Sequence, residues 1–170
     1  MPELTRLTTE FVPIEDRIRI TGESGPENIT ITLWLTKRLA NHLVPHLCAW
    51  LEKKTGSDMR GEIMQSFAQQ AALAAMAPQP PVQAGEESSG GLVRSMNIQT
   101  GDEGVRLIFG LMDERQENDA TLTLQTQALR QWLGIVHSQY LKGGWPLSVW
   151  PEWIREAKAT EAIRAASALH

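Results

Sequence analysis

Cysteine is almost absent from this sequence of 170 residues, because Cys48 is the only one. A single cysteine cannot form an intrachain disulfide, and it excludes zinc sites that need several thiolates. Cys48 lies in a leucine-rich segment, where a free cysteine usually packs as a small apolar side chain. We therefore expect its role to be structural rather than reactive.

Long apolar runs are also lacking, since no segment approaches the ~20 apolar residues that span a bilayer. The N-terminus, Met1-Pro2-Glu3, has neither the basic region nor the apolar region of a signal peptide. Together these absences predict a cytoplasmic protein without a membrane contact.

An excess of positive charge is missing as well. The formal net charge is −4, which provides no general attraction to nucleic acid or to an anionic membrane. The sequence does contain one local group of cations, formed by Arg17, Arg19, Lys37 and Arg38. These cations are the basis for a hypothesis of nucleic-acid binding, but the acidic balance elsewhere weighs against it.

The familiar catalytic signatures do not occur: the sequence has no GxGxxG, GxxxxGK[ST], HExxH or GxSxG motif. We therefore expect no catalytic residue and no cofactor. His42 and His46 are weak candidates for metal ligands, because their spacing places both imidazoles on one helical face. Arg38 and Lys53 share that face and repel a cation, and Pro45 disturbs the helix between the histidines. We interpret this face as solvated.

One order of elements occurs twice in the sequence. Each copy has a strand with alternating apolar residues, a turn, a second strand rich in threonine and leucine, and a helix. The first copy has strands at 17–21 and 29–35 and a helix from 36 to 51; the second has strands at 105–112 and 120–124 and a helix from 126 to 141. A β-leaning segment precedes each copy, at 4–12 and at 92–100.

The two copies match at nearly constant offsets. Arg19 corresponds to Arg106 at an offset of 87 positions, and Leu39 corresponds to Leu129 at an offset of 90. Thr36 and Thr126, which are also 90 positions apart, are both expected to be N-caps. Internal duplication and convergent patterning of two ordinary hairpin–helix units both explain this match, and the sequence favours duplication.

The predicted fold class is α+β, with two pseudo-repeated antiparallel β-meander-plus-helix halves, a middle helix and a C-terminal helix anchored by tryptophans. The middle helix carries Ile63, Met64, Phe67, Ala71 and Ala74 among many alanines, and small residues on such a face permit close approach of another helix. Segment 78–91 is rich in proline, serine and glycine, which predicts a linker. The predicted layout is a first half at 1–57, the middle helix at 58–77, the linker at 78–91, a second half at 92–143 and the tail at 144–170.

Tryptophan is concentrated near the C-terminus, with Trp145, Trp150 and Trp153 in one short stretch. Trp34 lies on the threonine face of its strand, where an exposed tryptophan would mark a contact site. Alternatively, the tryptophan-rich tail or the middle helix covers this face within the chain.

The leading functional hypothesis is a non-catalytic protein-binding adaptor, assembly factor or chaperone-like subunit. The predicted partner-binding residues are four apolar anchors and three orienting cations: Trp34, Trp145, Trp150, Trp153, Arg17, Arg19 and Arg38. The first alternative is a small-molecule-binding protein or enzyme with its site between the two halves, where His42, His46 and Cys48 would be tested first. The second alternative is the nucleic-acid-binding protein. A homo-oligomer is compatible with each hypothesis.

Overall fold

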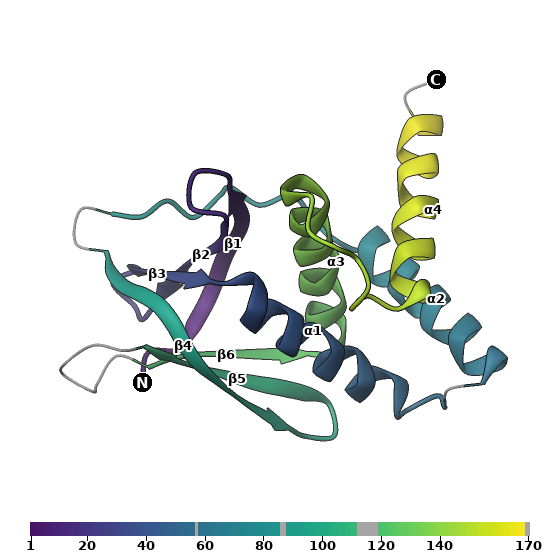
Figure 1. Ribbon diagram of the computed structural model, residues 1–170, viewed down its shortest axis with the longest axis horizontal. Coiled ribbons are helices and arrows are strands. Elements are labelled where there is room, and N and C mark those ends of the chain that lie inside the picture. Colours follow the sequence, from purple (N-terminus) through teal and green to yellow (C-terminus); the bar gives the residue numbers. More distant parts are fainter. Residues whose placement is uncertain (57, 86–87, 112–118, 169–170) are drawn as a thin grey trace.

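The computed structural model describes residues 1–56, 58–85, 88–111 and 119–168. These residues form one sheet and four helices, so the predicted α+β class is confirmed (Figure 1). The strands are β1 (Leu4–Val12), β2 (Arg17–Ser24), β3 (Ile29–Leu35), β4 (Ser89–Thr100), β5 (Gly104–Leu111) and β6 (Ala120–Gln125). The helices are α1 (Lys37–Glu52), α2 (Met59–Ala74), α3 (Thr126–Gly143) and α4 (Glu152–Ala168).

The strands follow one another in the sheet in the order β1 to β6. Neighbours are antiparallel within β1–β3 and within β4–β6, whereas β3 and β4 run parallel. The sheet curls until its two edge strands, β1 and β6, approach each other. Glu3, just before β1, forms an isolated parallel bridge with Thr121 of β6. At the same place the Thr121 N–H donates to the carbonyl of Pro2 at 2.9 Å.

The strands form because their side chains alternate between a buried and a partly exposed face. In β2, Ile18 and Ile20 are fully buried, while Arg17 and Arg19 lie on the other face and are half-buried. In β5, Val105, Leu107 and Phe109 form the corresponding buried set. These apolar side chains join the leucines of α1 and α3 in a single core.

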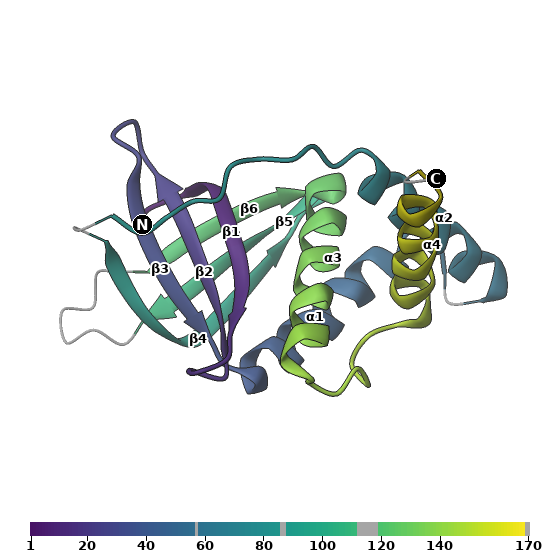
Figure 2. The same ribbon diagram turned by 90° about the horizontal axis from the view of Figure 1, so that it is seen from above.

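The molecule has three layers, which Figure 2 shows with the curled sheet at one end, α1 and α3 beside it, and α2 and α4 at the other end. The predicted N-cap of α1 is confirmed, since the hydroxyl of Thr36 accepts a hydrogen bond from the N–H of Leu39 at 3.3 Å. The predicted N-cap Thr126 is wrong. Gln125 occupies the N-cap position of α3, because the Thr126 hydroxyl instead donates to the carbonyl of Glu103 at 3.1 Å.

The two meander-plus-helix halves share more than their order of elements. Both first hairpins have a register irregularity near the start of their first strand, at Leu4/Arg6 and at Val93/Ser95. The buried residues of α1 match those of α3 at an offset of 89 positions rather than 90, as Ala40 with Leu129, Leu43 with Trp132 and Leu51 with Tyr140. Because two ordinary hairpin–helix units would also share this order, duplication stays a prediction.

The segment between α2 and β4 is not a simple spacer. It runs back along the outer face of the sheet past β1 (Figure 2), and Val82 is buried there. The Val82 N–H donates to Oγ1 of Thr8 at 2.8 Å, and the Gly85 N–H donates to Oγ1 of Thr30 at 2.9 Å. We expected the tryptophan-rich tail or the middle helix to cover the threonine face of strand 29–35, and this was wrong at Thr30, which the segment between α2 and β4 contacts. These two backbone N–H groups of the proline-rich segment, which belong to no helix or strand, therefore bond to threonine hydroxyls of the sheet.

Two predicted connections lie partly outside the described residues, namely the linker at 86–87 and the loop between β5 and β6 at 112–118. The predicted linker also extended too far, because residues 89–91 already belong to β4.

Candidate functional site

Three of the four tryptophans predicted as partner anchors are buried inside the chain. Trp145, Trp150 and Trp153 expose only 3–5% of their surface. Trp145 donates from Nε1 to Oδ1 of Asp16 at 3.1 Å, and Trp153 donates from Nε1 to Oε1 of Glu52 at 2.9 Å. The tail and α4 therefore dock on the chain itself.

Tyr140 of α3 lies at the centre of an aromatic cluster that receives the tail. Its ring packs edge-to-face with Trp145 and Trp150, at centroid distances of 5.0 Å and 5.2 Å. Its hydroxyl donates to Oδ1 of Asn41 at 2.6 Å, which links α3 to α1. Edge-to-face pairs contribute about 0.5–1.5 kcal/mol each beyond burial. These tryptophans thus have a structural role, and their role in binding a partner stays a prediction.

The other predicted partner-binding residues lie elsewhere. Trp34 is half-buried on the outer face of the sheet, where the guanidinium of Arg19 lies 5.8 Å from the centre of its ring. Arg19 also forms an ion pair with Glu10, and Arg17 lies on the same face of β2. Arg38 is exposed in the first turn of α1. The structure therefore divides the predicted set between the sheet surface and the helical layers.

The candidate metal ligands His42 and His46 are both exposed on α1. In the part of the chain that the structure describes, no group of three or more His, Cys, Asp and Glu side chains is placed to hold a metal ion. Cys48 is buried, and its burial raises the pKa of the thiol well above its ordinary value. It packs in the core as a small apolar side chain.

His137 of α3 is another ionisable group whose pKa is shifted strongly by burial in the core. It exposes 3% of its surface, and neither ring nitrogen has a hydrogen-bond partner among the described residues. Its ring lies edge-to-face with Trp150 at 5.0 Å. Burial lowers the pKa of His137 to about 4, and the nearby cations Lys158 and Arg155 contribute to this decrease. The ring is therefore neutral near pH 7.

The helix α2 differs from an ordinary surface helix, because half of its buried residues are polar while its largest apolar side chains are exposed. Gln65 donates from Nε2 to the carbonyl of Leu51 at 2.7 Å, and its Oε1 accepts from Nη2 of Arg130 at 2.6 Å. Gln69 donates from Nε2 to the carbonyl of Arg130 at 2.7 Å. The glutamine amides therefore attach α2 to both inner helices. The buried residues of α2 are Gly61, Gln65, Ser66, Gln69, Ala72 and Leu73.

The opposite side of α2 presents large apolar side chains to solvent. The exposed fractions are 78% for Met59, 49% for Ile63, 50% for Met64 and 65% for Phe67. We call these four residues the outer face of α2. These large side chains face solvent because the hydrogen bonds of Gln65 and Gln69 hold the other side of α2 inward.

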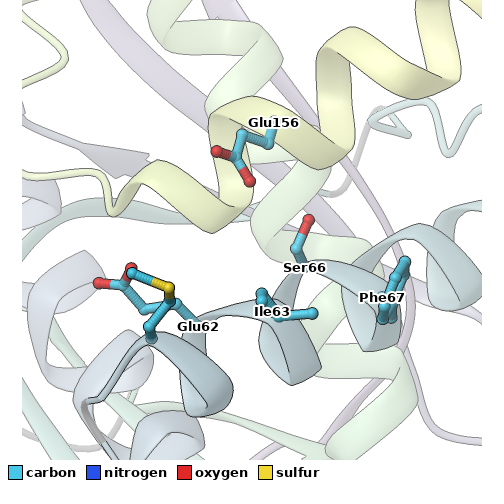
Figure 3. Close-up of a pocket in the computed structure, with 6 residues that line it drawn as sticks. Glu62, Ile63, Ser66, Phe67 and Glu156 are labelled. Carbon is cyan, nitrogen blue, oxygen red and sulfur yellow. The ribbon is translucent and has the colours of Figure 1, made fainter.

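A groove of about 350 Å³ lies between α2 and α4 (Figure 3). Glu156 points from α4 toward α2 in this view. A smaller pocket of about 50 Å³ shares Glu62 with the groove and reaches Trp153 and Glu52. Neither of these two pockets is lined by residues of the second half, so neither lies between the two halves, where the small-molecule hypothesis places its site. The residues that line the groove are Met59, Glu62, Ile63, Ser66, Phe67 and Glu156.

Comparisons of the chain with protein-family models, with curated proteins and with solved structures give no match. None of the helices in the described part of the chain combines the length and the apolar character that a bilayer crossing requires. The α+β fold and the outer face of α2 are therefore the observations from which a function is inferred.

Proposed function

We propose that this chain is a non-catalytic protein-binding subunit, of the adaptor, assembly-factor or chaperone-like kind, and that a partner protein docks on the outer face of α2. The observation that carries the proposal is the exposure of four large apolar side chains on a helix whose polar side is buried. A helix at a solvated surface normally has the reverse arrangement. Contiguous exposed apolar surface marks contact sites, and methionine adapts to irregular apolar partners.

The surroundings of α2 favour the same role, because they hold the outer face rigidly. The glutamine network attaches α2 to α1 and α3, and α4 lies beside it. In this proposal, buried Trp150 and Trp153 hold α4 in place, and α4 forms the second wall of the groove. A preorganised surface loses less conformational entropy when a partner binds. The cytoplasmic location expected from the sequence belongs to the same proposal.

Site-specific photo-crosslinking in cells tests the proposal. A photoreactive phenylalanine analogue is introduced at position 67 of the full chain, and the matched control carries it at position 14. Ile14 is 92% exposed in the turn between β1 and β2. This turn belongs to the sheet, which lies at the opposite end of the molecule from α2 (Figure 2). We expect one defined protein adduct from position 67 and none from position 14.

Equal adducts from both positions, or none from a folded protein at position 67, would contradict the proposal. An adduct that contains only a second copy of this chain would identify the outer face of α2 as a self-association surface. A small molecule retained by the intact chain in native mass spectrometry, without a protein adduct, would favour the alternative of a ligand-binding protein.

A further inference from the structure

The groove between α2 and α4 is acidic as well as apolar. Glu62 of α2 and Glu156 of α4 both line it. Within the described part of the chain neither carboxylate has an ion-pair partner, since the ion pairs there are Arg6–Glu23 and Arg19–Glu10 on the sheet. The adjoining pocket adds the carboxylate of Glu52.

The described cations of α4 do not neutralise these carboxylates, because hydrogen bonds turn them in other directions. Arg155 donates from Nη2 to the carbonyl of Leu147 at 2.6 Å. Lys158 donates from Nζ to the carbonyl of Gly134 at 3.3 Å. In α2 the sequence provides a single cation, Arg60, at the N-terminal end of the helix. Negative charge therefore prevails where the groove meets the apolar outer face.

We infer that the groove selects a basic amphipathic helix of the partner protein, an inference that rests on the function proposed above. The apolar positions 59, 63 and 67 follow one side of α2 over about 12 Å, at ~1.5 Å per residue. This length suits two turns of a partner helix with apolar residues at i, i+3 or i+4, and i+7. Lysine or arginine beside that apolar stripe would pair with Glu62 and Glu156.

The two kinds of contact have different physical effects. Burial of Phe67 and Ile63 supplies the main part of the affinity, because these side chains lose their contact with water. The carboxylates act on the choice of partner, since a like charge opposite them is repelled and an opposite charge is attracted. Carboxylates near a surface are screened by salt, so the selection should weaken as ionic strength rises.

The test uses two synthetic helical peptides with the same leucine stripe, one flanked by lysines and the other by glutamates. Binding to the full chain is measured by NMR titration, at low salt and at about 1 M salt, where the Debye length is ~3 Å. Three double variants are compared: Glu62→Gln with Glu156→Gln, Glu15→Gln with Glu27→Gln, and Ile63→Ser with Phe67→Ser. The second pair removes two exposed carboxylates from the turns of the sheet and is the control for net charge.

We expect the lysine peptide to bind about 10-fold more tightly than the glutamate peptide at low salt, which corresponds to ~1.4 kcal/mol. The shifts should fall on α2 and α4. The preference should largely disappear in the Glu62→Gln, Glu156→Gln variant and at high salt, but persist in the control for net charge.

Equal binding of the two peptides would overturn the inference, and so would an equal loss in both carboxylate variants. If binding is lost with Ile63→Ser and Phe67→Ser while charge makes no difference, the docking face stands and the basic partner is wrong. If neither peptide binds, the inference is wrong, and the crosslinking experiment decides the proposed function by itself.

Discussion

The two helices beside the sheet, α1 and α3, differ from α2 in which side chains they bury. In α1 and α3 the buried side consists mainly of leucine and aromatic residues, although α3 also buries Arg130, His137 and Gln139. In α2 the glutamines are turned inward and the methionines, Ile63 and Phe67 are turned outward. In α2, Gln65 and the Nε2 of Gln69 have hydrogen-bond partners, whereas Oε1 of Gln69 and Nη1 of Arg130 are buried without one among the described residues.

The difference between the layers gives separate expectations for stability and for the proposed binding. Exchange of a leucine in α1 or α3 removes packed surface, so it should cost free energy of unfolding. Exchange of an exposed apolar residue in α2 removes little packed surface, so it should change binding instead. The following predictions test this division, beginning with the largest expected effect.

The substitution Leu133→Ala in α3 should have the largest effect on stability. Leu133 is fully buried between the sheet and the helices, and its loss leaves a cavity in the core. Large-to-small changes of this kind typically cost about 2–5 kcal/mol in free energy of unfolding. Urea denaturation measures the loss, and a change below about 1 kcal/mol would show that the inner layer is loosely packed.

The substitution Gln65→Ala tests the polar attachment of α2. It removes the acceptor of the buried Arg130 and the donor to the Leu51 carbonyl, which should cost about 1–3 kcal/mol. Gln70→Ala is the matched control, because Gln70 is only partly buried and bonds to Ser66 within the same helix. Equal stability losses in both variants would mean that the inward glutamine does not hold the helix.

Acid should destabilise the inner layer through His137. Its pKa is about 6.5 when unfolded and about 4 in the folded chain, so the folded state binds fewer protons between these values. The stabilisation is complete above pH 6.5, decreases as the pH falls toward 4 and changes no further below it. We expect a loss on the order of 1–2 kcal/mol, because one pKa unit corresponds to ~1.4 kcal/mol and solvent screening reduces the full value.

The pH dependence is measured by urea denaturation between pH 7 and pH 4 for the wild type and for His137→Gln. The variant should lose less stability over this range than the wild type. His42→Gln, on the exposed side of α1, should behave like the wild type. Identical curves for His137→Gln and the wild type would show that the buried imidazole does not titrate in this window.

Local sequence signals predicted the elements that depend on local chemistry. The alternation of Ile18 and Ile20 with Arg17 and Arg19 predicted β2, and the hydroxyl of Thr36 predicted the start of α1. The predicted cap at Thr126 was wrong, because its hydroxyl donates a hydrogen bond to the carbonyl of Glu103, 23 residues earlier in the chain. Signals within an element therefore succeed until a distant group competes for the same atom.

The orientation of α2 could not be predicted, for a related reason. A helix with Gln65 and Gln69 on one side and Ile63 and Phe67 on the other would normally turn its apolar side inward, and the structure has the reverse arrangement. The inward side of α2 is determined by its hydrogen bonds to Arg130 of α3 and to the carbonyl of Leu51 of α1. The abundance of tryptophan indicated a contact surface, but it could not show that three of the tryptophans pack within the chain itself.

The most direct measurement is made on the double variant Ile63→Ser with Phe67→Ser, with unfolding and position-specific crosslinking measured on the same protein. The photoreactive analogue is placed at the neighbouring exposed position Met64. We predict a change within about 0.5 kcal/mol in the free energy of unfolding, because Phe67 is 65% and Ile63 is 49% exposed, together with loss of the partner adduct. A stability loss above about 2 kcal/mol with an unchanged adduct would contradict the account, because the outer face of α2 would then serve the fold and not a partner.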